Sequence, residues 1–178
     1  MCHNTCQGGS LMREMTRHRE GYMPVLADAA ATAVRTKKEE DFQFVLNMLE
    51  KCYINGEKFT CPYEDGEAPK QVKRPIVQVG EYHFLLVFTS PEEALQFDSM
   101  KDMEEPVAEV VQMVCEQEEE NPLHGIAINL YSSKKGPIPC IVLKSDLQKI
   151  NQKCKDVFEQ FIIPQMMQMQ PGNRMRFL

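Results

Sequence analysis

The sequence predicts an α+β protein with a small mixed or antiparallel sheet packed by about four helices. Residues 82–88 form an apolar run that stops abruptly at a helix start, as a strand does when it leads into a capped helix. Strand-like and helix-like segments do not alternate regularly, which favours an α+β order over repeated βαβ units. The 178 residues are 43% hydrophobic, so the chain can bury a core of ordinary size.

The first element with a predicted start signal is a helix that begins near Thr36. Thr36 and Glu39 have the spacing of a capping box, in which a hydroxyl and a carboxylate satisfy free amides at a helix start. Apolar residues then recur at helical spacing as far as Cys52, which defines one buried face. Residues 59–61 follow as a short strand that is expected to end at Pro62.

The segments 76–79 and 82–88 predict a β-hairpin closed by a two-residue Gly-Glu loop. This loop length sets a register in which Gln78 lies opposite His83. The second strand is apolar on both faces in its later part, which is typical of a central strand with packing on each side.

A short helix over residues 91–97 is predicted directly after this strand. Ser90 can cap the helix, Pro91 suits its first position, and Glu93 completes a capping box. The hydroxyl of Ser90 is therefore expected to serve folding rather than catalysis.

The C-terminal half predicts a helix over 106–119, two strands over 125–130 and 140–143, and a last helix. Ser145 and Gln148 have the spacing of another capping box. The last helix is expected to end before Pro164, with its buried stripe formed by Leu147, Ile150, Cys154, Val157, Phe158 and Phe161.

Three blocks of this sequence, residues 84–94, 125–129 and 141–147, resemble in order and spacing the SseB N-terminal domain family, named for enhanced serine sensitivity in bacteria. The resemblance covers roughly residues 38 to 150. It implies a small bacterial cytoplasmic domain without an agreed catalytic residue. One departure concerns the second block, because the family usually has proline after its Asn, whereas Leu130 follows Asn129 here.

The chain is accordingly divided into three parts. Residues 1–35 are expected to be an N-terminal extension that is partly helical or flexible. Residues 36–163 are expected to form a domain that resembles the SseB N-terminal family, and residues 164–178 a tail rich in Met and Gln.

Composition excludes several classes of function. A net charge of −6 and a pI near 5.3 argue against nucleic acid as a partner, because binding its phosphates requires clustered Lys and Arg. No apolar run is long enough to span a membrane, and the N-terminus lacks the pattern of a secretory signal. A cytoplasmic location is expected, and the seven cysteines are expected to be reduced.

Two groups of residues are weak candidates for chemistry. A Cys-His nucleophile could only be assembled from Cys61, Cys140, His83 and His124, although no local motif supports it. Part of a metal site could be formed by Cys2, His3 and Cys6, since thiolate and imidazole are the ligands that zinc prefers. The usual zinc spacing and a second ligand pair are missing, so neither a metal nor another cofactor is expected.

The expected function is therefore a non-enzymatic cytoplasmic binding or regulatory module whose partner is a protein or a small ligand. One alternative is a cysteine-dependent enzyme or sulfur-handling protein that uses Cys61 or Cys140. Another is an accessory subunit of a larger assembly, whose Met-rich ends become ordered on a partner.

Overall fold

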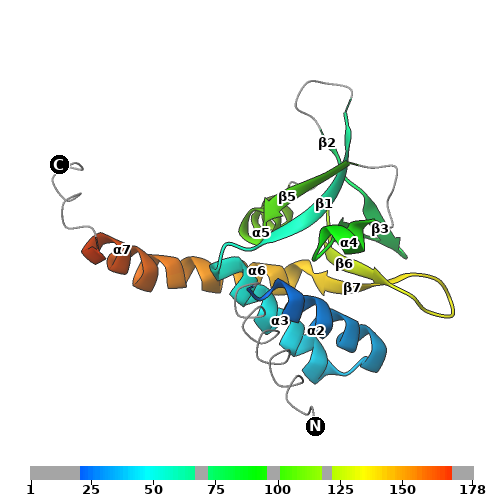
Figure 1. The fold of residues 1–178 in the computed structure, drawn as a ribbon, viewed down its shortest axis with the longest axis horizontal. Coiled ribbons are helices and arrows are strands. Elements are labelled where there is room, and N and C mark those ends of the chain that lie inside the picture. The colour runs from blue at the N-terminus through cyan, green and yellow to red at the C-terminus, as the bar shows by residue number, and fades with distance from the viewer. Residues whose placement is uncertain (1–20, 67–71, 96–100, 118–121, 170–178) are drawn as a thin grey trace, which may run out of the picture.

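The structure, a computed structural model, describes residues 21–66, 72–95, 101–117 and 122–169 (Figure 1). Its strands form two small sheets, so the predicted mixture of strands and helices is present, but one sheet was expected and two are found. The three-stranded sheet has the order β2 (Val72–Lys73), β1 (Lys58–Asp65), β5 (Lys101–Pro106). The four-stranded sheet has the order β3 (Ile76–Val79), β4 (Tyr82–Val87), β6 (Gly125–Tyr131), β7 (Ile138–Leu143).

The helices of the described ranges pack around these sheets. They are α2 (Met23–Thr36), α3 (Glu39–Ile54), α4 (Pro91–Ala94), α5 (Val107–Glu116), α6 (Lys144–Val157) and α7 (Ile163–Met169), with a π-helical turn (Phe158–Ile162) between the last two. Figure 1 shows α2 and α3 side by side below the sheets, whereas α7 continues from α6 away from the body of the molecule.

The predicted hairpin and its central strand are confirmed. β3 and β4 pair antiparallel with Gln78 opposite His83, and Gly80 in the loop has a φ of 62°, a conformation that glycine adopts without strain. β4 also pairs with β6 in the parallel direction, while β6 and β7 are antiparallel. The four-stranded sheet is therefore mixed, and β4 lies inside it.

β4 is covered on both faces, as its apolar sequence predicts. Leu85 and Val87 belong to the main core beneath the helices, whereas Phe84 and Leu86 belong to a smaller cluster on the opposite face. The two sheets meet at the end of this strand, where Thr60 and Phe88 exchange backbone hydrogen bonds of 2.9 Å in each direction.

α2 belongs to the core, although its residues fall largely within the segment 1–35 that the sequence set apart. Leu26 is fully buried. At the start of the helix, Oε1 of Glu57 accepts hydrogen bonds from the backbone N–H groups of Tyr22, at 2.6 Å, and Met23, at 2.9 Å. This carboxylate satisfies amides that a helix start leaves free. Because it comes from a distant part of the chain, no local capping motif indicates it.

Of the three predicted capping boxes, one is confirmed for its hydroxyl half. The Ser90 side chain accepts a hydrogen bond from the Glu93 N–H at 3.3 Å, and α4 begins with Pro91 as expected.

The predictions of the other two capping boxes, at Thr36 and at Ser145, are wrong. α3 has Lys38 as its N-cap residue, and the Thr36 hydroxyl donates to Asp41 instead, because α2 extends as far as Thr36. α6 begins at Lys144, with Leu143 in the capping position and no side-chain cap. Ser145 is thus already inside that helix.

Two strand predictions also need correction. β1 continues through Pro62, which lies opposite Asp102 of β5. On its other side β1 pairs with β2 only at Glu64 and Asp65, so Pro62 sits where no β2 residue requires its missing N–H group. No strand was predicted at residues 101–106, where β5 lies, because its charged sequence is that of an edge strand rather than of a buried one.

The last helix does not end before Pro164, which is the second residue of α7. Proline removes a helical hydrogen bond and crowds the carbonyl four residues earlier. The π-helical turn precedes it, where the Ile163 N–H bonds to the Phe158 carbonyl, and this wider turn accommodates the proline. The predicted buried stripe stops at Phe158, because Phe161 is 60% exposed.

Candidate functional site

The structure does not bring the two candidate cysteines together. Cys61 lies on β1 and Cys140 on β7, in different sheets, and both are almost fully buried. Cys140 is opposite Ile128, four residues beyond His124 along β6, which corresponds to about 13 Å of strand. No Cys-His pair is therefore formed from this set.

Burial also makes both thiols weak nucleophiles. It raises the pKa of Cys140 to about 11. Burial raises the pKa of Cys61 as well, and the nearby Glu105 carboxylate adds to the effect. Because the thiolate is the reactive form, these cysteines are nearly all protonated at neutral pH and behave as small apolar side chains.

The two histidines, in contrast, lie next to each other. The His83 N–H donates to Nδ1 of His124 at 3.0 Å, and the His124 N–H donates to the His83 carbonyl at 2.7 Å. Since Nδ1 of His124 accepts a hydrogen bond, a neutral ring carries its proton on Nε2. The ring of Tyr82 meets the His124 ring edge to face at 5.0 Å. His124 thus extends the contact between β4 and β6, and its position does not depend on a nearby thiol.

The candidate metal ligands Cys2, His3 and Cys6 lie outside the described residues. Within the described ranges, no group of three His, Cys, Asp or Glu side chains is arranged to hold a metal ion.

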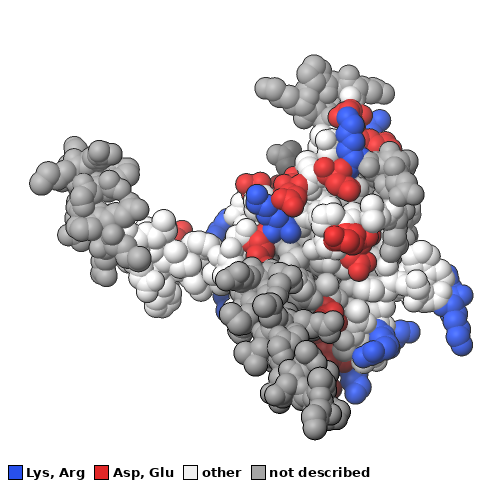
Figure 2. All heavy atoms as spheres, in the orientation of Figure 1, with Lys and Arg blue, Asp and Glu red and all other residues white. Residues whose placement is uncertain are grey.

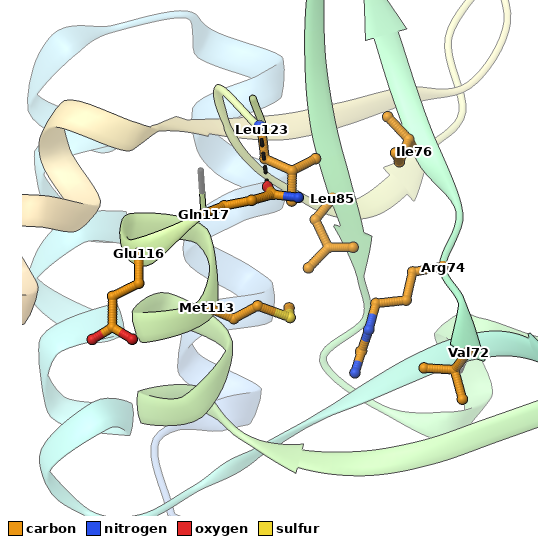
Figure 3. Close-up of a pocket in the computed structure, with 8 residues that line it drawn as sticks. All are labelled: Val72, Arg74, Ile76, Leu85, Met113, Glu116, Gln117 and Leu123. Carbon is orange, nitrogen blue, oxygen red and sulfur yellow. Dashed lines mark hydrogen bonds between the residues drawn. The ribbon is translucent and has the colours of Figure 1, made fainter. Parts of the chain in front are cut away.

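An apolar groove of about 370 Å³ opens between the β2–β3 segment and α5 (Figure 3). The extended β2–β3 segment contributes every second residue, and α5 contributes the opposite wall. The lining residues are Val72, Arg74, Ile76, Leu85, Met113, Glu116, Gln117 and Leu123. They come from four separate stretches of the chain, so no single sequence motif indicates the groove.

Charge in this groove is largely balanced. Arg74 and Glu105 form two hydrogen bonds, one of them 2.6 Å between Nη2 and Oε1, and both side chains are less than one-fifth exposed. Burial alone would raise the pKa of Glu105, but the hydrogen bonds and charge of Arg74 outweigh it and lower that pKa. In Figure 3 the Glu116 carboxylate points away from the other lining side chains. The groove can accept an apolar group, but it presents no activated nucleophile or base.

Asn129, which precedes the departure at Leu130, is fully buried and has a φ of 55°. Its Oδ1 accepts from the Thr89 N–H, and its Nδ2 donates to the Thr89 hydroxyl, both at 2.9 Å. Nδ2 also donates to the Tyr131 hydroxyl, which donates in turn to the Ala27 carbonyl of α2. Asn tolerates this left-handed conformation, so the amide holds the irregularity in β6, where the pairing with β7 shifts register, without a following proline. The network has a structural role that sequence reasoning missed.

The most exposed apolar surface of the described helices lies at the C-terminal end. We call residues 158–167 the arm. Its exposed large apolar residues are Phe161 at 60%, Ile163 at 47%, Met166 at 62% and Met167 at 60%. Figure 2 shows the arm as a projection of mostly uncharged side chains, and Glu159 is its only charged residue.

No family model matches this chain, and neither a curated protein sequence nor a solved structure matches it. Among the helices of the described ranges, none combines the length and apolar character needed to cross a membrane.

Proposed function

We propose that the chain is a non-enzymatic cytoplasmic binding module of the SseB N-terminal type, and that its arm inserts into an apolar groove of a protein partner. The exposure of the four apolar side chains on the arm is the observation that carries this proposal. The family assignment rests on the succession of the three sequence blocks.

Within the arm, Phe158 packs against the core, but the four exposed apolar side chains are buried only if another surface covers them. The arm continues from α6 through the π-helical turn, and Pro164 removes one helical hydrogen bond within it. Large contiguous apolar surfaces on soluble proteins commonly mark interaction sites. Met166 and Met167 suit such a role, because thioether side chains adapt their shape to a partner.

The competing proposal of a cysteine-dependent enzyme receives less support. Its candidate thiols, Cys61 and Cys140, are buried with raised pKa values and lie on different sheets. The proposal of an accessory subunit is a special case of the binding module, in which the partner belongs to a stable assembly.

Replacing two exposed apolar side chains of the arm by acidic ones tests the proposal. The variant is Met166→Glu/Met167→Glu, and the matched control is Gln160→Glu/Gln165→Glu, which adds the same charge at other exposed positions of the helix. Full-length chains would be purified from native lysate by affinity, followed by quantitative mass spectrometry. We expect one stoichiometric protein to accompany the wild type and the control and to be lost from the variant.

A second step ties that protein to the arm. The purified partner should bind a peptide of residues 158–169 and lose this binding when both methionines are replaced by Glu. Equal recovery of the partner with both chains, or recovery of no stoichiometric protein with either, would overturn the proposal.

A further inference from the structure

The two edges of the four-stranded sheet differ in how they are protected. At one edge, β7 carries Pro139, which has no N–H to offer, and α2 packs against this strand. Proline and a covering element are common protections of sheet edges against pairing with another chain. In the three-stranded sheet, the edge strand β5 is protected by a high density of charged side chains.

The opposite edge, β3, shows none of these protections within its own length. Its sequence is Ile-Val-Gln-Val, without charge or proline. Ile76 is 54% exposed and Val79 is 50% exposed, on opposite faces of the strand. An uncharged apolar edge strand of this kind is suited to accept another strand.

The hydrogen bonds of the hairpin show which backbone groups of β3 point outward. The Leu86 N–H donates to the Pro75 carbonyl at 3.1 Å, so Pro75 faces β4. In an antiparallel ladder, hydrogen-bonded and non-hydrogen-bonded pairs alternate. Val77 and Val79 therefore bond to β4, while Ile76 and Gln78 direct their N–H and C=O groups away from it.

We propose that two copies of the chain pair antiparallel through β3, with a two-fold axis at Val77. In this register Ile76 of each copy lies opposite Gln78 of the other, and each such pair exchanges two backbone hydrogen bonds. Val77 meets its own counterpart on the axis. The two four-stranded sheets then become one continuous sheet, and this proposal is independent of the arm.

Charge complementarity selects a second copy as the occupant of this edge. Lys73 and Glu81 are exposed, have opposite signs and lie four residues on either side of Val77. Lys73 lies in β2, opposite Glu64 of β1, and Glu81 lies in the hairpin loop, so both are just beyond the ends of β3. Antiparallel pairing about Val77 brings Lys73 of one copy to the same end of the paired strands as Glu81 of the other, twice by symmetry. An unrelated strand would satisfy the backbone groups but would match these two charges only by chance.

The size of this contact predicts a reversible dimer. A short edge-to-edge strand pair buries less surface than the roughly 1,200 Å² at which stable interfaces begin. Sedimentation velocity of the full chain over a range of concentrations is therefore the appropriate measurement, and we expect a shift from monomer to dimer as concentration rises.

Two sets of variants test the register. Gln78→Pro removes an outward N–H without breaking a bond to β4, so it should abolish the dimer, whereas Gln78→Ala should retain it.

Glu81→Lys should raise the dimer dissociation constant about tenfold, because two attractive pairs become repulsive. Combining Glu81→Lys with Lys73→Glu should restore dimer formation, since the charges then match again.

Circular dichroism melting of each variant would verify that the monomer remains folded. A chain that stays monomeric at every concentration would overturn the proposal, as would a dimer that Gln78→Pro leaves intact or that the double charge variant fails to restore. The dimer should persist in Met166→Glu/Met167→Glu. Its loss in that variant alone would assign self-association to the arm and would also overturn pairing through β3.

Discussion

α6 and the arm belong to one continuous helical path. The apolar side chains of α6 are buried against the rest of the fold, whereas most of those of the arm are exposed. In α6, Leu147, Ile150 and Cys154 are almost fully buried. In the arm, Phe161 and Met166 are each at least 60% exposed. The periodicity of the sequence assigns both parts an apolar face, so the pattern indicates which residues share a face and does not indicate whether a neighbour covers it.

The difference arises from what surrounds each part. α6 packs against α3 and α5, and Lys153 forms a 3.0 Å ion pair with Glu50 of α3. The arm extends past these helices (Figure 1). The covered half therefore contributes to folding stability, while the exposed side chains of the arm contribute little to it.

The largest expected effect is on the covered half. Leu147→Ala should lower the free energy of unfolding by about 2–5 kcal/mol, because it removes a fully buried side chain and leaves a cavity. Urea denaturation monitored by circular dichroism would measure the change. Gln148→Ala, at an exposed position on the same helix, is the control and should change stability by less than about 0.5 kcal/mol. Similar effects at both positions would mean that α6 is not a core helix.

A smaller, pH-dependent effect is expected at Cys154. Burial, with a further contribution from Glu50, raises the pKa of this thiol from 9.0 to about 11. The stability gained from the neutral buried thiol is therefore fully present below pH 9 and is lost as the pH rises through about 11. Cys154→Ala should be less stable than the wild type at pH 8, and the difference should shrink by pH 10.5 in thermal melts. A difference that stays constant over this range would contradict the expected titration.

The smallest effect is expected on the bare half. Phe161→Ala should change the free energy of unfolding by less than about 0.5 kcal/mol, because the ring is mostly exposed and alanine favours the helix. The same denaturation measurement applies. A decrease in the free energy of unfolding of more than about 1 kcal/mol would contradict the difference between α6 and the arm, because it would show that the arm packs onto the folded chain in solution.

Sequence reasoning reached the features whose causes lie close together along the chain. The β3–β4 register follows from a two-residue loop, and the Ser90 cap follows from residues three positions apart. Sequence reasoning did not predict β5, because a charged edge strand lacks the apolar alternation that marks a half-buried strand. The pairing of His83 with His124 lies beyond local reasoning as well, since 41 residues separate the two.

By itself, the sequence determined the central hairpin, the helix that Ser90 caps and the apolar faces of the longer helices, because these depend on local spacing and on side-chain chemistry. Only the tertiary structure decided that the strands divide into two sheets and that Glu57 caps α2. It also decided that β3 and β7 are the two edges of the four-stranded sheet, and that the apolar side chains of the arm are exposed. The reason is physical: burial and hydrogen bonding across a fold depend on which distant segments become neighbours, and periodicity along the chain carries no information about that.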